Sequence, residues 1–101
     1  MAHTRDRDMI TPLTVAGEPV LTLRQIDRLN GVPKGTAFRA FKRARDRLRE
    51  GEDFHRFDAT THGEWIERLR AQGLVYPATV HVLVFTRAGY ERLLYAHKNQ
   101  Q

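Results

Sequence analysis

The chain contains no cysteine and no long apolar run, and each of these absences excludes a class of proteins. Without thiols it cannot form disulfides, use a thiol nucleophile or bind a metal through thiolates. No apolar stretch approaches the roughly 20 residues that a transmembrane helix needs. The first residues also lack the apolar core of a signal peptide. We therefore expect a cytoplasmic protein with no membrane partner.

Catalytic and metal-binding patterns are missing as well. The sequence has no glycine-rich phosphate loop, no nucleophile elbow and no paired catalytic carboxylates. None of the five histidines has the spacing of a metal ligand with another histidine or with a carboxylate; they are His3, His55, His62, His81 and His97. The protein is thus not expected to be an enzyme, and we predict no catalytic residue, metal, cofactor or small-molecule substrate.

Acidic residues are scarce in one segment, residues 34–49. This segment holds one anion, Asp46, and seven cations, namely Lys34, Arg39, Lys42, Arg43, Arg45, Arg47 and Arg49. Its net charge is +6, whereas the whole chain carries +5, so all other residues together carry −1. A positive charge concentrated in one segment favours a polyanion as the partner.

The length of 101 residues and the 41% apolar content fit one small α+β domain. We place this domain at residues 11–97, with a flexible lead-in at 1–10 and a frayed end at 98–101. Two β-favouring runs between residues 13 and 21 predict an N-terminal hairpin. Thr22 is a suitable N-cap for a helix over 23–29, which Asn30-Gly31 should end.

A second helix is predicted over 37–49, with Thr36 as its N-cap. Helical spacing gives it a buried stripe, with Ala40 on one flank; the stripe is Ala37, Phe41, Ala44 and Leu48. Segments 54–58 and 80–85 should pair as a two-stranded wing, and Thr86 should cap a C-terminal helix. The intervening segment 59–79, with a helix around Trp65, either packs in the core or forms a homodimer seam.

Two short helices joined by a tight turn have the layout of a helix-turn-helix, so the predicted fold is a small winged helix-turn-helix. The outer face of the second helix would then enter the major groove of DNA. The residues expected to read bases are Thr36, Arg39, Lys42 and Arg43. Lys34, the Thr36 amide and the arginines at 45, 47 and 49 are expected at phosphates. Arg56 or His55 on the wing would add contacts, unless the sheet only covers the core.

Three alternatives stay open at this point. The basic helix could be merely solvated, although it offers only Asp46 for i,i+4 pairing. It could instead dock on an acidic protein surface, as an antirepressor or inhibitor does. RNA binding is less favoured, because no aromatic platform for stacking bases is evident.

The chain departs from the usual helix-turn-helix motif at Asp27, because a small residue usually precedes the turn glycine by four positions.

Residues 12–95 resemble the KilA-N-like N-terminal domains of phage antirepressors and prophage regulators. The resemblance begins at Gly17 and continues through Val20-Leu21-Thr22, Gly31-Val32 and Phe41-Lys42-Arg43; it closes with Phe85-Thr86-Arg87-Ala88-Gly89-Tyr90. Members often have Asn where this chain has Ala44, and segment 59–79 looks like a local elaboration. A small basic winged module is also similar to phage excisionases.

The resemblance implies a DNA-binding module of phage or prophage origin, acting in the bacterial host at the nucleoid. We therefore expect a sequence-specific double-stranded DNA-binding protein, either a transcriptional regulator or an excisionase that controls recombination. Such proteins read repeated or palindromic sites, so a homodimer or a cooperative array on DNA is a possible assembly.

Overall fold

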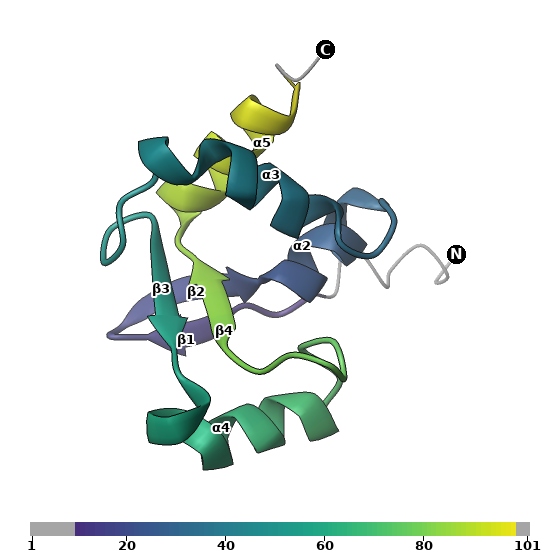
Figure 1. Cartoon of the computed structure of the whole chain (residues 1–101), viewed down its shortest axis with the longest axis vertical. Helices are drawn as coiled ribbons and strands as arrows, with labels where there is room; N and C mark the ends of the chain where they lie inside the picture. Colours follow the sequence, from purple (N-terminus) through teal and green to yellow (C-terminus); the bar gives the residue numbers. More distant parts are fainter. Residues whose placement is uncertain (1–9, 99–101) are drawn as a thin grey trace.

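The computed structural model describes residues 10–98, so the predicted lead-in and frayed end fall largely outside the described residues. The elements follow one another along the chain as β1 (Leu13–Val15), β2 (Glu18–Thr22), α2 (Leu23–Asn30), α3 (Thr36–Ala44), the 3₁₀ helix η2 (Arg45–Arg47), β3 (Phe54–Phe57), α4 (Ala59–Ala71), β4 (Val82–Phe85) and α5 (Arg87–Lys98). The predicted α+β class is confirmed. Figure 1 shows α3 and α5 on one side of the strands and α4 on the other.

The four strands form one antiparallel sheet in the order β1-β2-β4-β3. The predicted N-terminal hairpin and the predicted pairing of β3 with β4 are both confirmed. A separate two-stranded wing is wrong, however, because β4 also pairs with β2, placing Leu21 opposite Phe85. The physical reason is that an isolated two-stranded ribbon is only marginally stable in water, whereas a wider sheet can pack its apolar faces against helices.

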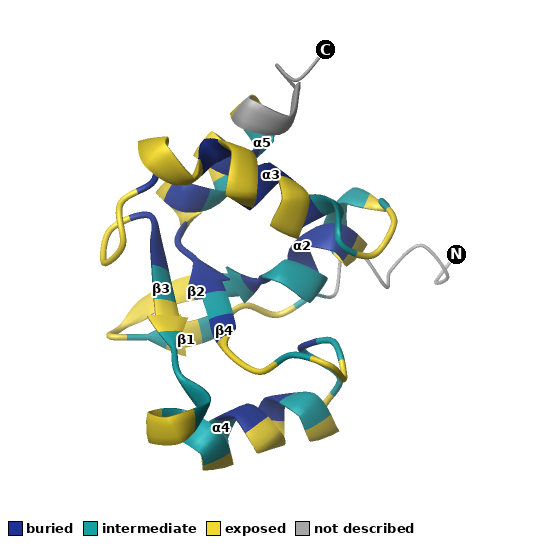
Figure 2. Cartoon of the chain, viewed as in Figure 1, coloured by how far each residue is buried: buried dark blue, intermediate teal, exposed yellow. Residues whose placement is uncertain are grey.

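Side-chain alternation along β4 divides the core into two clusters, one on each face of the sheet (Figure 2). Leu83 and Phe85 face the cluster that includes α3 and Leu93 of α5. Val82 and Val84 face the cluster that includes Ile66 and Leu69 of α4. Segment 59–79 therefore packs in the core, which was one of the two predictions for it. Strand β4 begins at Val82 and not at the predicted residue 80, and Val80 lies outside it with 58% of its surface exposed.

The first helix, α2, begins and ends where the sequence predicts. The Thr22 hydroxyl accepts a hydrogen bond from the Gln25 amide, and the Gln25 side chain accepts one from the Thr22 amide. This reciprocal capping box satisfies two N–H groups that would otherwise have no partner. At the other end Gly31 adopts the left-handed conformation, with φ of 64°, that such a C-cap requires.

The second helix is shorter than predicted. The predicted N-cap role of Thr36 is wrong, because Thr36 is the first residue of the helix and Gly35 occupies the N-cap position. The helix ends at Ala44, and η2 and an extended Leu48 follow. In a continued helix the Arg49 amide would donate to the Arg45 carbonyl. Here it donates to Oδ2 of Asp53 at 2.9 Å, so the helix does not resume after η2. The predicted stripe is buried nonetheless, and Ala40, expected on its flank, is buried with it.

The predicted helix around Trp65 is part of α4, whose N-cap residue is Asp58 and whose backbone is kinked at His62. The C-terminal helix is capped as predicted, because the Thr86 hydroxyl accepts from the Gly89 amide at 3.1 Å. None of the helices within residues 10–98 has the length and apolarity that crossing a bilayer requires.

Candidate nucleic-acid interface

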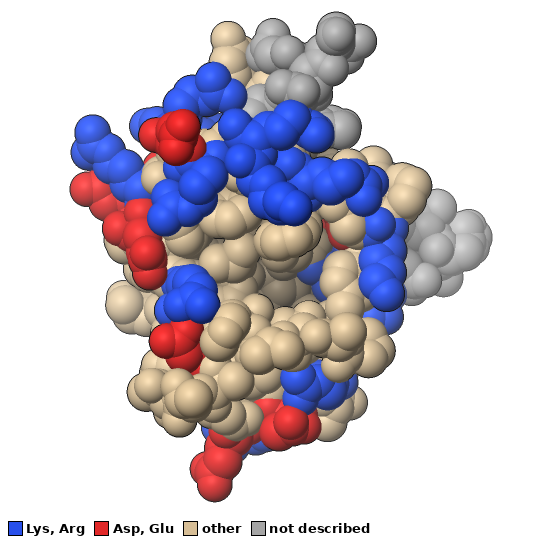
Figure 3. Space-filling model, in the orientation of Figure 1, with Lys and Arg blue, Asp and Glu red and all other residues tan. Residues whose placement is uncertain are grey.

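Lysine and arginine side chains gather in a band over α3 (Figure 3). The band follows from the local packing: α3 buries its alanines and Phe41 against the sheet and α5, so its long cationic side chains can only point outward. All seven cations of residues 34–49 are exposed, including the predicted base-reading residues Arg39, Lys42 and Arg43. The predicted exposure of these side chains is therefore confirmed, and their role in reading bases stays a prediction.

Most of these cations have no acidic neighbour. Arg49 lies 3.5 Å from a carboxylate oxygen of Glu52, and Arg56 on β3 lies 2.5 Å from one of Asp58. Within residues 10–98, no carboxylate oxygen lies within 4.0 Å of the other six, which are Lys34, Arg39, Lys42, Arg43, Arg45 and Arg47. The positive charge of this surface is thus not neutralised locally, and it would attract an anion from solution.

Three of these cations lie over aromatic rings, which the sequence pattern does not reveal as part of the site. Lys42 Nζ lies 5.3 Å from the ring centre of Phe38, and the guanidinium of Arg45 lies 5.0 Å from that of Phe54. Lys34 Nζ lies 5.3 Å from the ring centre of Tyr76. Cations over aromatic faces are attracted by the ring quadrupole. The rings thereby restrict the cationic side chains while leaving them exposed.

The N-terminus of α3 is already occupied by a carboxylate, that of Asp27. This side chain is only 2% exposed, and it accepts hydrogen bonds from the Gly35 amide at 3.0 Å and the Ala37 amide at 2.8 Å. The Thr36 amide donates to the Pro33 carbonyl at 3.1 Å, and the Thr36 hydroxyl does so at 2.7 Å. The Thr36 amide is therefore already hydrogen-bonded within the protein, which argues against its predicted contact with a phosphate. Asp27 supplies the anion that this helix end favours.

The hydrogen bonds of Asp27 explain why this position departs from the usual motif. A small residue at this position would let the two helices touch, whereas here the carboxylate joins them through hydrogen bonds. The Tyr76 hydroxyl donates to the same carboxylate at 2.5 Å, which ties residues after α4 to the turn between α2 and α3. Burial, together with the hydrogen bond and the charge of Asp27, raises the pKa of Tyr76 to about 12.

Tyr76→Phe should therefore show a specific pH dependence. Because the folded-state pKa of Tyr76 lies above its ordinary value of 10.0, its stabilisation is fully present below pH 10 and is lost as the pH rises to about 12. The wild type should exceed Tyr76→Phe by about 1–2 kcal/mol in unfolding free energy near neutral pH, a figure reduced for partial solvent exposure. Urea unfolding at several pH values measures this difference, which should close in alkali.

Tyr95→Phe, at a residue that is 70% exposed, is the control variant. It shows how far the stability changes in alkali because other groups in the chain titrate. A stability difference between wild type and Tyr76→Phe that stays constant across this pH range would contradict the proposed role of the Tyr76–Asp27 hydrogen bond.

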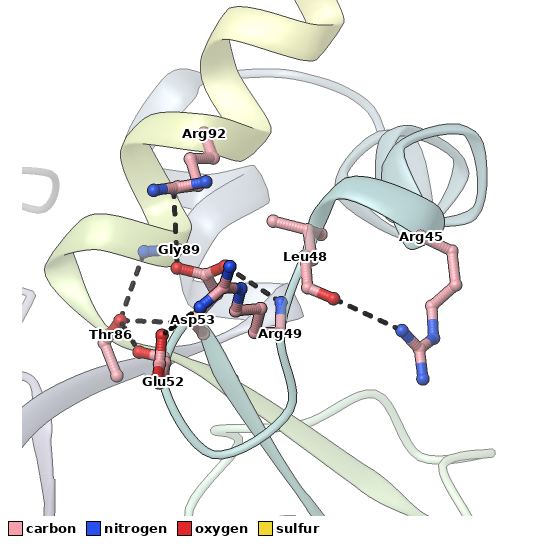
Figure 4. Close-up of polar contacts among 8 residues, drawn as sticks. All are labelled: Arg45, Leu48, Arg49, Glu52, Asp53, Thr86, Gly89 and Arg92. Atoms are coloured by element: carbon pink, nitrogen blue, oxygen red, sulfur yellow. Dashed lines mark hydrogen bonds and ion pairs between the residues drawn. The ribbon is translucent and has the colours of Figure 1, made fainter.

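The turn after η2 is anchored to the start of α5 (Figure 4). The Thr86 hydroxyl donates to the carbonyl oxygens of Glu52 at 2.8 Å and Asp53 at 3.2 Å, and the Thr86 amide donates to the latter at 3.0 Å. The Asp53 carboxylate in turn accepts from the Arg49 amide and lies 3.5 Å from Arg92. These contacts hold the end of the basic segment in place. They also give a structural reason for the Phe85-to-Tyr90 motif.

Arg56 lies opposite Leu83 in the sheet, on the face that carries α3. It lines a cavity of about 430 Å³ together with Arg45, so the structure brings this predicted residue close to the basic segment. His55, the alternative to Arg56, points to the other face, as alternation along β3 requires. Its Nε2 is buried and has no hydrogen-bond partner among the described residues, so it does not form part of the basic surface.

Within residues 10–98, no three histidine, aspartate or glutamate side chains gather as potential metal ligands. The residues that the structure brings together are the cations of 34–49, Arg56 and the aromatic rings beneath them. Comparisons of the chain with models of known protein families, with curated proteins and with solved structures gave no match.

Proposed function

We propose that this protein binds double-stranded DNA through the exposed face of α3 and η2. The observation that carries the proposal is the set of six exposed cations with no carboxylate within 4.0 Å among the described residues. Solvated helices usually mix charges of both signs, and repulsion between like charges at i,i+4 costs a few tenths of a kcal/mol per pair. A duplex would remove that repulsion by placing phosphates between the cations.

In this proposal α2 and α3 act as a helix-turn-helix. The five residues between them are held by Asp27, so the orientation of α3 is set before DNA binds. An α-helix with its side chains is about 10–12 Å in diameter, which suits a major groove about 12 Å wide. Arg39, Lys42 and Arg43 would face the bases, and the remaining cations, with Thr36 beside them, would contact the backbone.

The role of such a DNA-binding protein is a further part of the proposal. The resemblance to KilA-N-like domains supports transcriptional regulation in a phage or prophage, and the similarity to excisionases supports a role in recombination. An excisionase should bend its site and bind repeats cooperatively, whereas a simple repressor need do neither. Gel mobility of circularly permuted sites distinguishes the two roles, and the stoichiometry of the same complexes shows how many copies bind.

The proposal predicts a steep salt dependence. If about four to six cations contact phosphates, the logarithm of the binding constant should fall with the logarithm of salt concentration with a slope of roughly −4 to −5. Fluorescence anisotropy with a labelled mixed-sequence duplex measures this slope. Arg39→Ala and Arg43→Ala should each weaken binding at least about fivefold.

Arg68→Ala, at an exposed position of α4, is the matched control and should leave the affinity nearly unchanged. Affinity weaker than about millimolar at low salt would contradict the proposal, because non-specific binding alone normally exceeds it.

A further inference from the structure

A trough lies beneath the basic band, and the proposed function does not use its floor. It consists of two cavities, of about 420 Å³ and about 430 Å³, that share Phe38, His81 and Leu83 in their walls. Figure 3 shows the face hollowed below the band of cationic side chains. The two cavities adjoin at these three residues, and we call them together the trough.

The trough has an apolar floor, and hydrogen bonds fix the position of its far wall. Leu83 lines it from the sheet and Leu23 from α2, and Phe38 of α3, with 44% of its surface exposed, lines it from the side of the basic band. Arg70 of α4 holds the far wall, donating to the Pro77 carbonyl at 3.1 Å and also to that of Thr79. An exposed apolar surface with a fixed shape can bind an apolar partner at low conformational cost.

Cations stand at both ends of this apolar floor. Arg24 and Lys34 line the first cavity, which has no carboxylate in its wall. Arg45 and Arg56 line the second, together with the single acidic residue Glu50. The trough therefore complements a ligand that combines apolar groups with negative charge.

The aromatic rings of the trough are poorly suited to stacking nucleobases. Phe38 stacks on Phe41, with ring centres 6.4 Å apart and planes at 19°, and Lys42 lies over the same ring. Arg24 and Lys34 lie over the ring of Tyr76, at 5.6 Å and 5.3 Å from its centre. A single strand needs free aromatic faces on which its bases can stack. Apolar peptide side chains can instead pack against ring edges and the aliphatic floor.

We propose that the trough binds a segment of an acidic partner protein, in which carboxylates alternate with apolar side chains. The apolar side chains would occupy the floor beside Phe38 and Leu83, and the carboxylates would meet Arg24 and Lys34. Lys34 and Arg45 also belong to the proposed DNA-binding surface. A bound segment would therefore compete with the duplex, and a partner protein would regulate access to DNA.

The test uses the full chain and a pool of short fluorescein-labelled peptides in which Asp or Glu alternates with Leu or Phe. Binding measured by anisotropy at physiological salt should weaken at least about tenfold in Phe38→Ser, as expected for a central apolar anchor. Arg24→Gln should weaken it about threefold, because rim charges contribute less. Val80→Ser, an exposed apolar residue outside both cavity walls, is the matched control and should bind as wild type does.

A second pool, with serine in place of Leu and Phe, tests whether charge alone is sufficient. Equal binding of both pools, no binding of the acidic apolar pool, or equal effects of Phe38→Ser and Val80→Ser would each overturn the proposal. A labelled single-stranded oligothymidine that bound more tightly, with the same sensitivity to Phe38→Ser, would assign the trough to nucleic acid instead. No duplex is needed for these measurements, so their outcome is independent of the proposed DNA binding.

Discussion

The double substitution of Lys42→Glu and Arg43→Glu should reduce duplex affinity by more than about 100-fold at low salt. Both side chains are exposed on α3 and have no carboxylate within 4.0 Å among the described residues. The substitution removes two cations and places two anions against the phosphates. The salt slope should therefore become less steep by about 2 or more. Anisotropy titrations of wild type and variant at several salt concentrations measure both quantities.

This variant should fold normally, because neither side chain takes part in the core. Its far-UV circular dichroism spectrum should match that of the wild type. Its free energy of unfolding, measured by thermal melting, should differ from that of the wild type by no more than about 0.5 kcal/mol, as for other surface substitutions. Arg68→Glu, the same kind of reversal on α4, should weaken duplex binding only a few-fold. If the double variant were folded and bound the duplex nearly as tightly as the wild type, α3 would not be the interface.

Gly89→Ala should destabilise the protein by about 3 kcal/mol or more, although alanine is normally the better helix former. A Cβ at this position would lie 1.8 Å from the Asp53 carbonyl oxygen and 2.6 Å from the carbonyl carbon. The backbone cannot shift cheaply, because the Thr86 amide and hydroxyl both donate to that same oxygen. Thermal unfolding should show a decrease of about 15 °C or more in melting temperature.

Gly63→Ala in α4 is the matched control for this substitution. A Cβ there would meet no atom within 4 Å, so the usual helix preference for alanine should apply. That variant should be up to about 1 kcal/mol more stable than the wild type. If Gly89→Ala also left the melting temperature unchanged or raised it, the start of α5 would not be packed against the turn at Asp53.

The candidate site was largely predictable from sequence because exposure of its residues is a local property. Arginine and lysine side chains are rarely buried without a partner, and the apolar stripe of α3 fixes which way the others point. The sequence did not reveal Phe38, Tyr76 or the trough as part of this surface. Tyr76 and the trough depend on residues 75–83, which are distant from α3 along the chain and are brought to it by the fold.

Local signals in the sequence determined α2, its caps at Thr22 and Gly31, the N-terminal hairpin, the cap of α5 and the exposure of the cations over residues 34–49. Each of these rests on interactions between residues that are close along the chain. Tertiary structure decided where α3 ends, what caps it and how β3 and β4 join the sheet. These outcomes depend on Thr86 and Arg92 holding Asp53, on Asp27 bonding to Tyr76 across 49 positions, and on β2 pairing with β4. The physical reason is that a carboxylate or a strand edge bonds whichever partner the fold brings to it, and that partner is not specified by local sequence.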